Sequence, residues 1–144
     1  MRGRIWLAVF STAAGCAVPA PGPLVSYHVT GDAIVSPLTA EPGDSERGRT
    51  VFMGRDGNCF LCHTAPGGRF MGNLGSPLAG VGARLDQGQL RLRIVDSARL
   101  NRETIMPSYY RVDGFNQVAA AWRGKPILTA QQVEDVVAYL RTLR

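Results

Sequence analysis

Two cysteines and a histidine stand together in the run Cys59-Phe60-Leu61-Cys62-His63. The two intervening residues allow one turn of chain to present both sulfur atoms to the same edge of a flat ligand. Thiols of this kind form thioethers with the vinyl groups of a porphyrin, and a histidine directly after the second cysteine then lies where its imidazole can bind the iron. The spacing therefore predicts one covalently bound haem, attached through Cys59 and Cys62, with His63 as an axial ligand.

The same cysteine pair has two other chemical interpretations. A structural zinc site needs four ligands, and the chain has three cysteines and two histidines, of which Cys16 and His28 lie outside the expected folded core. A thioredoxin-like dithiol follows a strand in a βαβ unit, and the sequence around Cys59 has no such pattern. Haem attachment is therefore the preferred interpretation, and a thiol redox protein that uses Cys59 and Cys62 is an alternative.

The other axial ligand must come from a later part of the chain, and Met106 is the best placed donor. Enough residues separate it from His63 to pass around a haem, whereas Met71 follows His63 too closely and is expected to pack in the interior. Pro107 has no amide hydrogen and stiffens the loop that carries Met106. A thioether opposite an imidazole favours reduced iron, so this ligand pair predicts an electron carrier.

The size and charge of the chain limit the possible functions. Its 144 residues, 45% of them hydrophobic, predict one domain with an ordinary core. The formal net charge of +5 is too small to indicate nucleic-acid binding. No nucleophile and base, and no carboxylate pair, can be placed together. An iron with six ligands has no position for a substrate, so we expect that this chain is not an enzyme by itself.

Residues 1–20 have the pattern of a secretory leader that is cleaved. Arg2 and Arg4 form its positive end, and the apolar run 5–14 is followed by small residues. This run is too short for a stable membrane span. The leader predicts export to the periplasm. Cys16 is expected to be discarded with the leader, and a lipid anchor at Cys16 is the alternative.

The remaining sequence divides into an arm over 21–43 and a domain over 44–144. The arm is rich in proline and glycine, which favours an extended chain, and His28 within it is expected to be solvated. Asp44 predicts the start of a helix over 45–53.

Two further helices are predicted from their start signals. Asp86 and Thr129 are each followed three residues later by a glutamine, as in a capping box. The glycine-rich stretch 65–82 between the first and second helices is expected to be a loop.

Several side chains are expected to face the haem or the core. Gly48 and Phe52 share one face of the first helix and permit a close crossing with the last helix. Trp122 is expected to form an apolar wall near the haem or the core. Hydrogen bonds to the haem carboxylates are possible from four residues after the Met-Pro pair: Tyr109, Tyr110, Arg111 and Trp122.

This order of helix, haem motif, glycine-rich loop, Met-Pro loop and final helix resembles the all-α class I cytochrome c fold. From about residue 28 onward the chain also resembles the SoxX family, the monohaem cytochromes of the bacterial thiosulfate-oxidising Sox system. The resemblance is carried by these runs: Gly31-Asp32-Ala33-Ile34, Pro42-Gly43-Asp44, Gly57-Asn58-Cys59, Gly80-Val81-Gly82-Ala83-Arg84, Arg93-Ile94-Val95-Asp96, Met106-Pro107, Tyr109-Tyr110-Arg111 and Gly124-Lys125-Pro126-Ile127-Leu128-Thr129.

The resemblance implies one haem c, with thioethers at Cys59 and Cys62 and with His63 and Met106 as axial ligands. It implies a heterodimer with a SoxA-like haem subunit that contains the catalytic haem. Such a complex is similar to an L-cysteine S-thiosulfotransferase, which joins thiosulfate to the carrier protein SoxYZ. This chain would then only pass electrons from the partner haem to an acceptor cytochrome. A free class I cytochrome c shuttle and a haem-based ligand sensor, in which Met106 dissociates, are the alternatives.

Two expectations follow for the surface and for the axial histidine. We expect Phe60-Leu61 and the stretch 67–75 to lie near the partner, and the arm to embrace it. Class I cytochromes commonly have Gly-Pro in the loop whose carbonyl orients the haem histidine. Here Ser76 stands between Gly75 and Pro77, so the pattern does not specify which carbonyl contacts His63.

Overall fold

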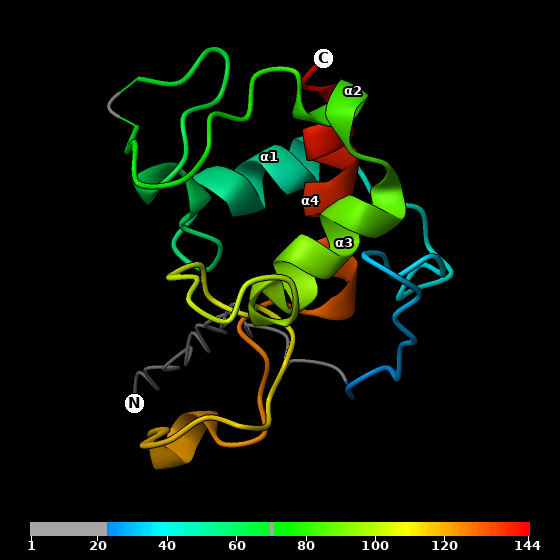
Figure 1. The fold of residues 1–144 in the computed structure, drawn as a ribbon, viewed down its shortest axis with the longest axis vertical. Coiled ribbons are helices and arrows are strands. Elements are labelled where there is room, and N and C mark those ends of the chain that lie inside the picture. Colours follow the sequence, from blue (N-terminus) through cyan, green and yellow to red (C-terminus); the bar gives the residue numbers. More distant parts are fainter. Residues whose placement is uncertain (1–22, 70) are drawn as a thin grey trace, which may run out of the picture.

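The chain folds into helices joined by long loops (Figure 1). The computed structural model describes residues 23–69 and 71–144, which leaves the predicted leader and Cys16 outside the described part. Within these ranges the only β-type pairing is one isolated bridge between Thr30 and Ala33, in agreement with the predicted all-α class. The helices, in chain order, are α1 (Ser45–Met53), η1 (Cys59–Leu61), α2 (Val81–Arg84), α3 (Gln87–Val95), η2 (Ser97–Arg99), η3 (Ala120–Trp122) and α4 (Ala130–Thr142).

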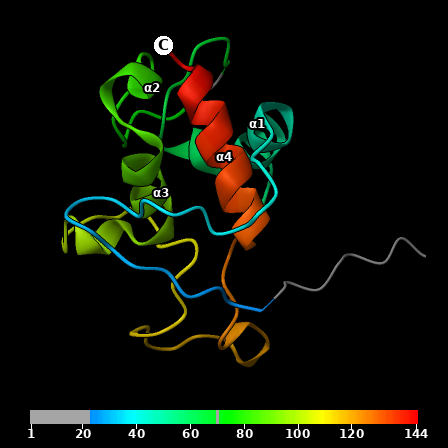
Figure 2. The same ribbon diagram turned by 90° about the vertical axis from the view of Figure 1, so that its right-hand side faces the viewer.

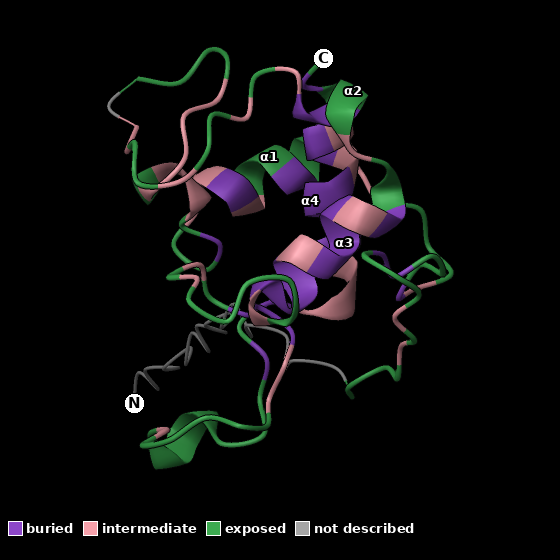
Figure 3. Ribbon diagram, viewed as in Figure 1, coloured by how far each residue is buried: buried purple, intermediate pink, exposed green. Residues whose placement is uncertain are grey.

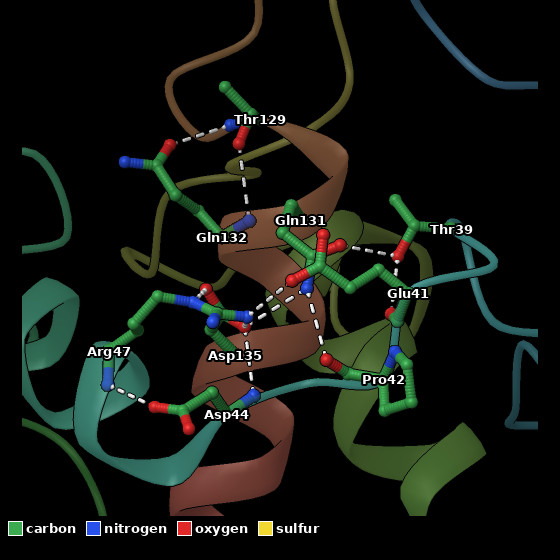
Figure 4. Close-up of polar contacts among 9 residues, drawn as sticks. All are labelled: Thr39, Glu41, Pro42, Asp44, Arg47, Thr129, Gln131, Gln132 and Asp135. Carbon is green, nitrogen blue, oxygen red and sulfur yellow. Dashed lines mark hydrogen bonds and ion pairs between the residues drawn. The ribbon is translucent and has the colours of Figure 1, made fainter.

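The three longest helices begin where their capping residues predict. The Asp44 side chain accepts a hydrogen bond from the backbone N–H of Arg47 at the start of α1. Asp86 and Thr129 form complete capping boxes at the starts of α3 and α4, and Figure 4 shows the one at Thr129. Each side chain satisfies an N–H group that has no partner within its helix, so these boundaries are encoded locally.

The loop expected over 65–82 ends at Gly80, because Val81 and Gly82 already belong to the short helix α2. Gly80 precedes it with φ of 72°, in the left-handed region that favours glycine. A Cβ atom on Gly82 would lie 2.5 Å from the carbonyl oxygen of Arg141. These glycines therefore allow one helical turn to pack against the end of α4, and this tertiary contact overrides the loop-like composition.

Helices α1 and α4 cross at a very close contact, as the Gly48/Phe52 face predicts. A Cβ atom on Gly48 would lie 1.9 Å from the carbonyl oxygen of Asp135. Phe52 packs on Tyr139 with ring centroids 5.3 Å apart. The faces that α1, α3 and α4 turn toward one another are buried (Figure 3), so this crossing forms one side of the core.

A polar network fixes the start of α1 on α4 (Figure 4). The Arg47 guanidinium donates to both carboxylate oxygens of Asp135 at 2.9 Å, and the Asp44 backbone N–H donates to the same carboxylate at 2.9 Å. Burial raises the pKa of Asp135, but hydrogen bonds from Arg47, Asp44 and Gln131 outweigh it and hold the pKa below its ordinary value. Asp135 is therefore a charged anchor for α1 near neutral pH.

The second half of the predicted arm lies on the chain's own helices (Figure 2). Ile34 and Leu38 are buried. The Ile34 backbone N–H donates to the Gly88 carbonyl at 3.0 Å, and the Leu38 backbone N–H donates to the Glu134 carboxylate at 2.8 Å. The arm is therefore anchored to α3 and α4 over this stretch.

A buried ion pair completes this anchor. Arg91 donates to both oxygens of Glu134, at 2.7 and 2.8 Å, and also donates to the Ile34 carbonyl at 2.6 Å. A buried ion pair is tolerated when its remaining polar atoms find partners, and the Ile34 and Leu38 backbone groups supply them. Ala33, Ile34 and Leu38 of the arm are therefore buried within this chain, while the expectation that the arm embraces a partner stays a prediction. His28 is exposed, as predicted.

No described helix is both long enough and apolar enough to span a membrane.

The close crossing generates a stability prediction. Gly48→Ala places a methyl group against the backbone of α4, where neither helix has a flexible side chain that can move away. We expect denaturant unfolding of the haem-loaded protein to show a loss of about 1–3 kcal/mol. Arg49→Ala, on the exposed side of α1, is the control and should change stability by less than about 0.5 kcal/mol. Equal stability of the two variants would contradict the close crossing.

Candidate functional site

The four predicted haem-binding residues converge on two adjoining cavities. One cavity has a volume of about 410 Å³ and the other about 450 Å³. Cys59, His63 and Met106 line both cavities, and Cys62 lines the larger. Residues far apart in the sequence are thus brought around one continuous hollow.

The smaller cavity is enclosed by apolar side chains from the helical core. Its walls come from α1, α2, α3 and α4 and from the loops between them. An apolar hollow bordered by two thiols, an imidazole and a thioether fits a flat apolar group that contains a metal ion. The apolar residues of this wall are Phe52, Pro77, Leu78, Val81, Leu85, Leu90, Ile94, Leu128, Val136 and Leu140.

The cysteine motif forms a single tight turn. Asn58 precedes it with φ of 51°, in the left-handed region, and η1 follows. The backbone N–H groups of Cys62 and His63 both donate to the Cys59 carbonyl, at 3.2 and 3.0 Å. Both sulfur-bearing residues and the histidine therefore belong to one hydrogen-bonded turn, as the spacing predicts.

A backbone carbonyl orients the His63 ring. Its Nδ1 atom lies 2.8 Å from the Ser76 carbonyl oxygen. A ring that donates from Nδ1 has a lone pair on Nε2 available for a metal. Sequence analysis left open which carbonyl makes this contact, because the contact uses the Ser76 backbone and no side chain indicates it.

Gly75 is required beside the histidine ring. A Cβ atom at this position would lie 2.4 Å from Cε1 of His63. The Gly75 backbone N–H also donates to the Cys62 carbonyl at 2.7 Å. The loop therefore approaches the imidazole more closely than a residue with a side chain allows.

Two arginines border the apolar cavity, and sequence analysis did not assign either of them to the site. Arg84 donates to the carbonyls of Ala79, at 2.6 Å, and Pro77, at 3.3 Å. Arg93 is half-buried and donates one hydrogen bond to the Gln89 carbonyl at 2.9 Å. Both arginines reach the cavity only because of how α2 and α3 pack. The sequence does not show this packing, and an arginine on a short or amphipathic helix is ordinarily expected at the surface.

The residues after Met106 are fixed along the end of α3. The backbone N–H groups of Tyr109 and Tyr110 donate to the carbonyls of Ile94 and Val95, at 3.0 and 3.2 Å. The Tyr109 hydroxyl donates to the Gly57 carbonyl at 2.7 Å. Tyr109 therefore links the Met106 loop to the turn that carries the cysteines.

The proposed hydrogen bonds to haem carboxylates need correction. Tyr110, Arg111 and Trp122 line neither cavity of the site. The Tyr110 hydroxyl accepts from the Val25 backbone N–H, and Arg111 pairs with Asp96 at 3.1 Å.

Trp122 is also not a wall of the core. Its side chain is 59% exposed, and it lies in η3, which extends away from the helices (Figure 1). Its aromatic character predicts burial, but the chain leaves the core over this stretch.

Met71 packs as expected and lies outside both cavities. Its sulfur accepts a hydrogen bond from the Ala65 backbone N–H at 3.1 Å. This contact holds the sulfur within its own loop.

The thiol environment disfavours the alternative of a thiol redox protein. Burial raises the pKa of the Cys59 thiol to about 11, whereas reactive cysteines have a lowered pKa. The described part of the chain also contains no cluster of three or more His, Cys, Asp or Glu residues suited to a metal ion such as zinc. A covalent role for the sulfur atoms therefore agrees best with the site.

Comparison with known proteins gives one family and one solved structure. The model of the cytochrome c family matches residues 45–144. The chain is similar to a chain in the crystal structure of SoxXA from P. pantotrophus, with 37% sequence identity and a TM-score of 0.74. The similarity covers 81% of this chain and 93% of that chain. No curated protein matches the sequence.

Tyr109 generates a prediction about the rigidity of the site. Tyr109→Phe removes the hydrogen bond to Gly57 and leaves a buried carbonyl without this donor. We expect a loss of about 1–2 kcal/mol in the denaturant unfolding of the haem-loaded protein. Tyr139→Phe is the matched control, because the described structure gives the Tyr139 hydroxyl no hydrogen bond and its ring is equally buried. A control variant as unstable as Tyr109→Phe would contradict the assigned role.

Proposed function

The chain belongs to the cytochrome c family, and we propose that it is the electron-transfer subunit of a SoxAX-type complex that oxidises thiosulfate. The convergence of Cys59, Cys62, His63 and Met106 on one continuous hollow is the observation that supports this most directly. The second support is the similarity to SoxXA, which extends over 93% of that chain.

The residues of the cavity fit the haem c that the family implies. Cys59 and Cys62 would form the two thioethers, and His63 and Met106 would be the axial ligands. The Ser76 carbonyl holds the His63 ring with Nε2 free, which is the tautomer that binds iron. When bound, haem c supplies one iron that gains and loses a single electron.

Arg84 and Arg93 fit the two carboxylates of a haem. They are the cationic side chains that border the smaller, apolar cavity among the described residues. A carboxylate next to a guanidinium is stabilised by charge-assisted hydrogen bonds. Arg84 also braces the loop after Ser76 through the Pro77 and Ala79 carbonyls, so the same side chain supports both the carboxylate and the axial histidine.

The open side of the larger cavity is suited to electron exchange with another protein. Leu74 and Ile105 line it and are 72% and 74% exposed. Leu61, between the two cysteines, is 54% exposed. Exposed apolar side chains beside a cofactor favour a protein contact over contact with a polar substrate. We place the docking surface for the partner haem subunit here.

The partner assignments complete the proposal. The partner is a SoxA-like haem subunit, which contains the reactive centre for thiosulfate and for the carrier SoxYZ. This chain accepts electrons from that subunit and passes them to an acceptor cytochrome. The complex functions in the periplasm, after export directed by residues 1–20. Residues 21–43 and 44–144 are the arm and the cytochrome domain of the mature subunit.

Axial ligation by Met106 has a direct spectroscopic test. The oxidised protein should show the weak far-red band of sulfur-to-iron charge transfer, and Met106→Ala should abolish it. The reduction potential should also fall in this variant, because a thioether favours reduced iron. Met71→Ala is the control and should retain the band. Loss of the band in Met71→Ala, with retention in Met106→Ala, would reverse the ligand assignment.

Dependence on a partner is tested by turnover. Purified subunit is mixed with thiosulfate, the carrier protein and an electron acceptor. We expect no turnover from this subunit alone, because His63 and Met106 occupy both axial positions. Turnover should appear when the SoxA-like subunit is added and should fall in Met106→Ala. Turnover without a second haem chain would falsify the proposal.

A further inference from the structure

The backbone of Met106 is held at both of its polar groups. Its carbonyl accepts a hydrogen bond from the Ser97 hydroxyl at 2.7 Å. Its N–H donates to the Thr104 hydroxyl at 3.1 Å. Ser97 is buried, with 7% of its surface exposed, so water does not readily replace the bond to the carbonyl. The position of the Met106 main chain is therefore set by two side-chain hydroxyls.

Ser97 directs its hydroxyl away from the helix that it begins. Serine at the start of a helix commonly bonds a nearby backbone N–H. Ser97 begins η2, and no side chain makes a capping hydrogen bond at this helix. Its hydroxyl instead extends across to a loop nine residues later in the chain. The bond thus connects the end of α3 to the Met106 loop.

The neighbouring Asp96 holds the residues on the other side of Pro107. Its buried carboxylate accepts a hydrogen bond from the Ser108 hydroxyl at 2.8 Å and pairs with Arg111 at 3.1 Å. The consecutive residues Asp96 and Ser97 therefore hold the chain before and after Pro107. Since Pro107 itself restricts the backbone between these two contacts, the Met106 side chain starts from a fixed base.

We propose that Ser97 is a positioning residue for Met106 and controls how readily other ligands displace its sulfur from the iron. This inference rests on the proposed axial role of Met106. The Met106 thioether is a neutral ligand carried by a loop. Its effective affinity for the iron is higher when the loop holds the sulfur close to the iron after the bond dissociates. Removal of an outer-shell partner of a metal ligand typically costs about 10–100-fold in affinity. The Ser97 hydroxyl therefore holds the sulfur in place through the Met106 carbonyl.

The test measures displacement of Met106 by cyanide in the oxidised haem-loaded protein at one fixed pH. Ser97→Ala should bind cyanide about tenfold more tightly than the unchanged protein, because the sulfur competes less well. Ser97→Thr retains a hydroxyl and should restore most of the resistance. Thr142→Ala is the control for loss of a hydroxyl away from the site, since the Thr142 hydroxyl donates to the Tyr139 carbonyl on α4 at 2.6 Å, and cyanide affinity should not change.

Hydrogen exchange separates this role from general destabilisation. In Ser97→Ala, the backbone amides of residues 104–110 should exchange faster, while those of α4 should not. Unchanged cyanide affinity in Ser97→Ala, or equal acceleration of exchange throughout the chain, would overturn the proposal. Failure of the proposed function looks different: the unchanged protein would then have no far-red band, and Met106→Ala would not alter cyanide binding.

Discussion

The close crossing of α1 and α4 is the contact on which the rest of the structure depends. Gly48 brings the α1 backbone against the Asp135 carbonyl, and Phe52 packs on Tyr139 one turn further along. The Arg47–Asp135 pair fixes the direction of the crossing. This arrangement turns Phe52 of α1 and apolar residues of α4 toward one side. The apolar hollow that suits a haem exists because those two helices meet so closely.

The chemical groups themselves lie on loops, and backbone hydrogen bonds connect these loops to the helical frame. The Ser76 carbonyl sets the His63 ring, and Tyr109 connects the Met106 loop to Gly57 next to the cysteine turn. Such contacts hold the axial donors in place without additional helices. A carrier of single electrons benefits from this arrangement, because a site that changes little between its two oxidation states requires little rearrangement for each transfer.

The features that sequence predicted are those with a local physical cause. The helix starts at Asp86 and Thr129 arise from side chains that bond N–H groups three residues away, and the cysteine turn arises from its spacing. The features that it missed depend on distant parts of the chain. No side chain indicates that the Ser76 carbonyl contacts His63. Ile34 is buried against an ion pair between α3 and α4, which come much later in the sequence. Trp122 is exposed although tryptophan is usually buried.

Covalent attachment of haem at the cysteine turn is the central claim, and peptide mass spectrometry tests it most directly. After the protein is extracted with acidified acetone and digested with trypsin, cleavage follows Arg55 and Arg69 and releases the peptide 56–69. We predict that this peptide carries the mass of one haem, bound through Cys59 and Cys62. Recovery of the peptide with both thiols free, and of the haem in the acetone, would contradict the account.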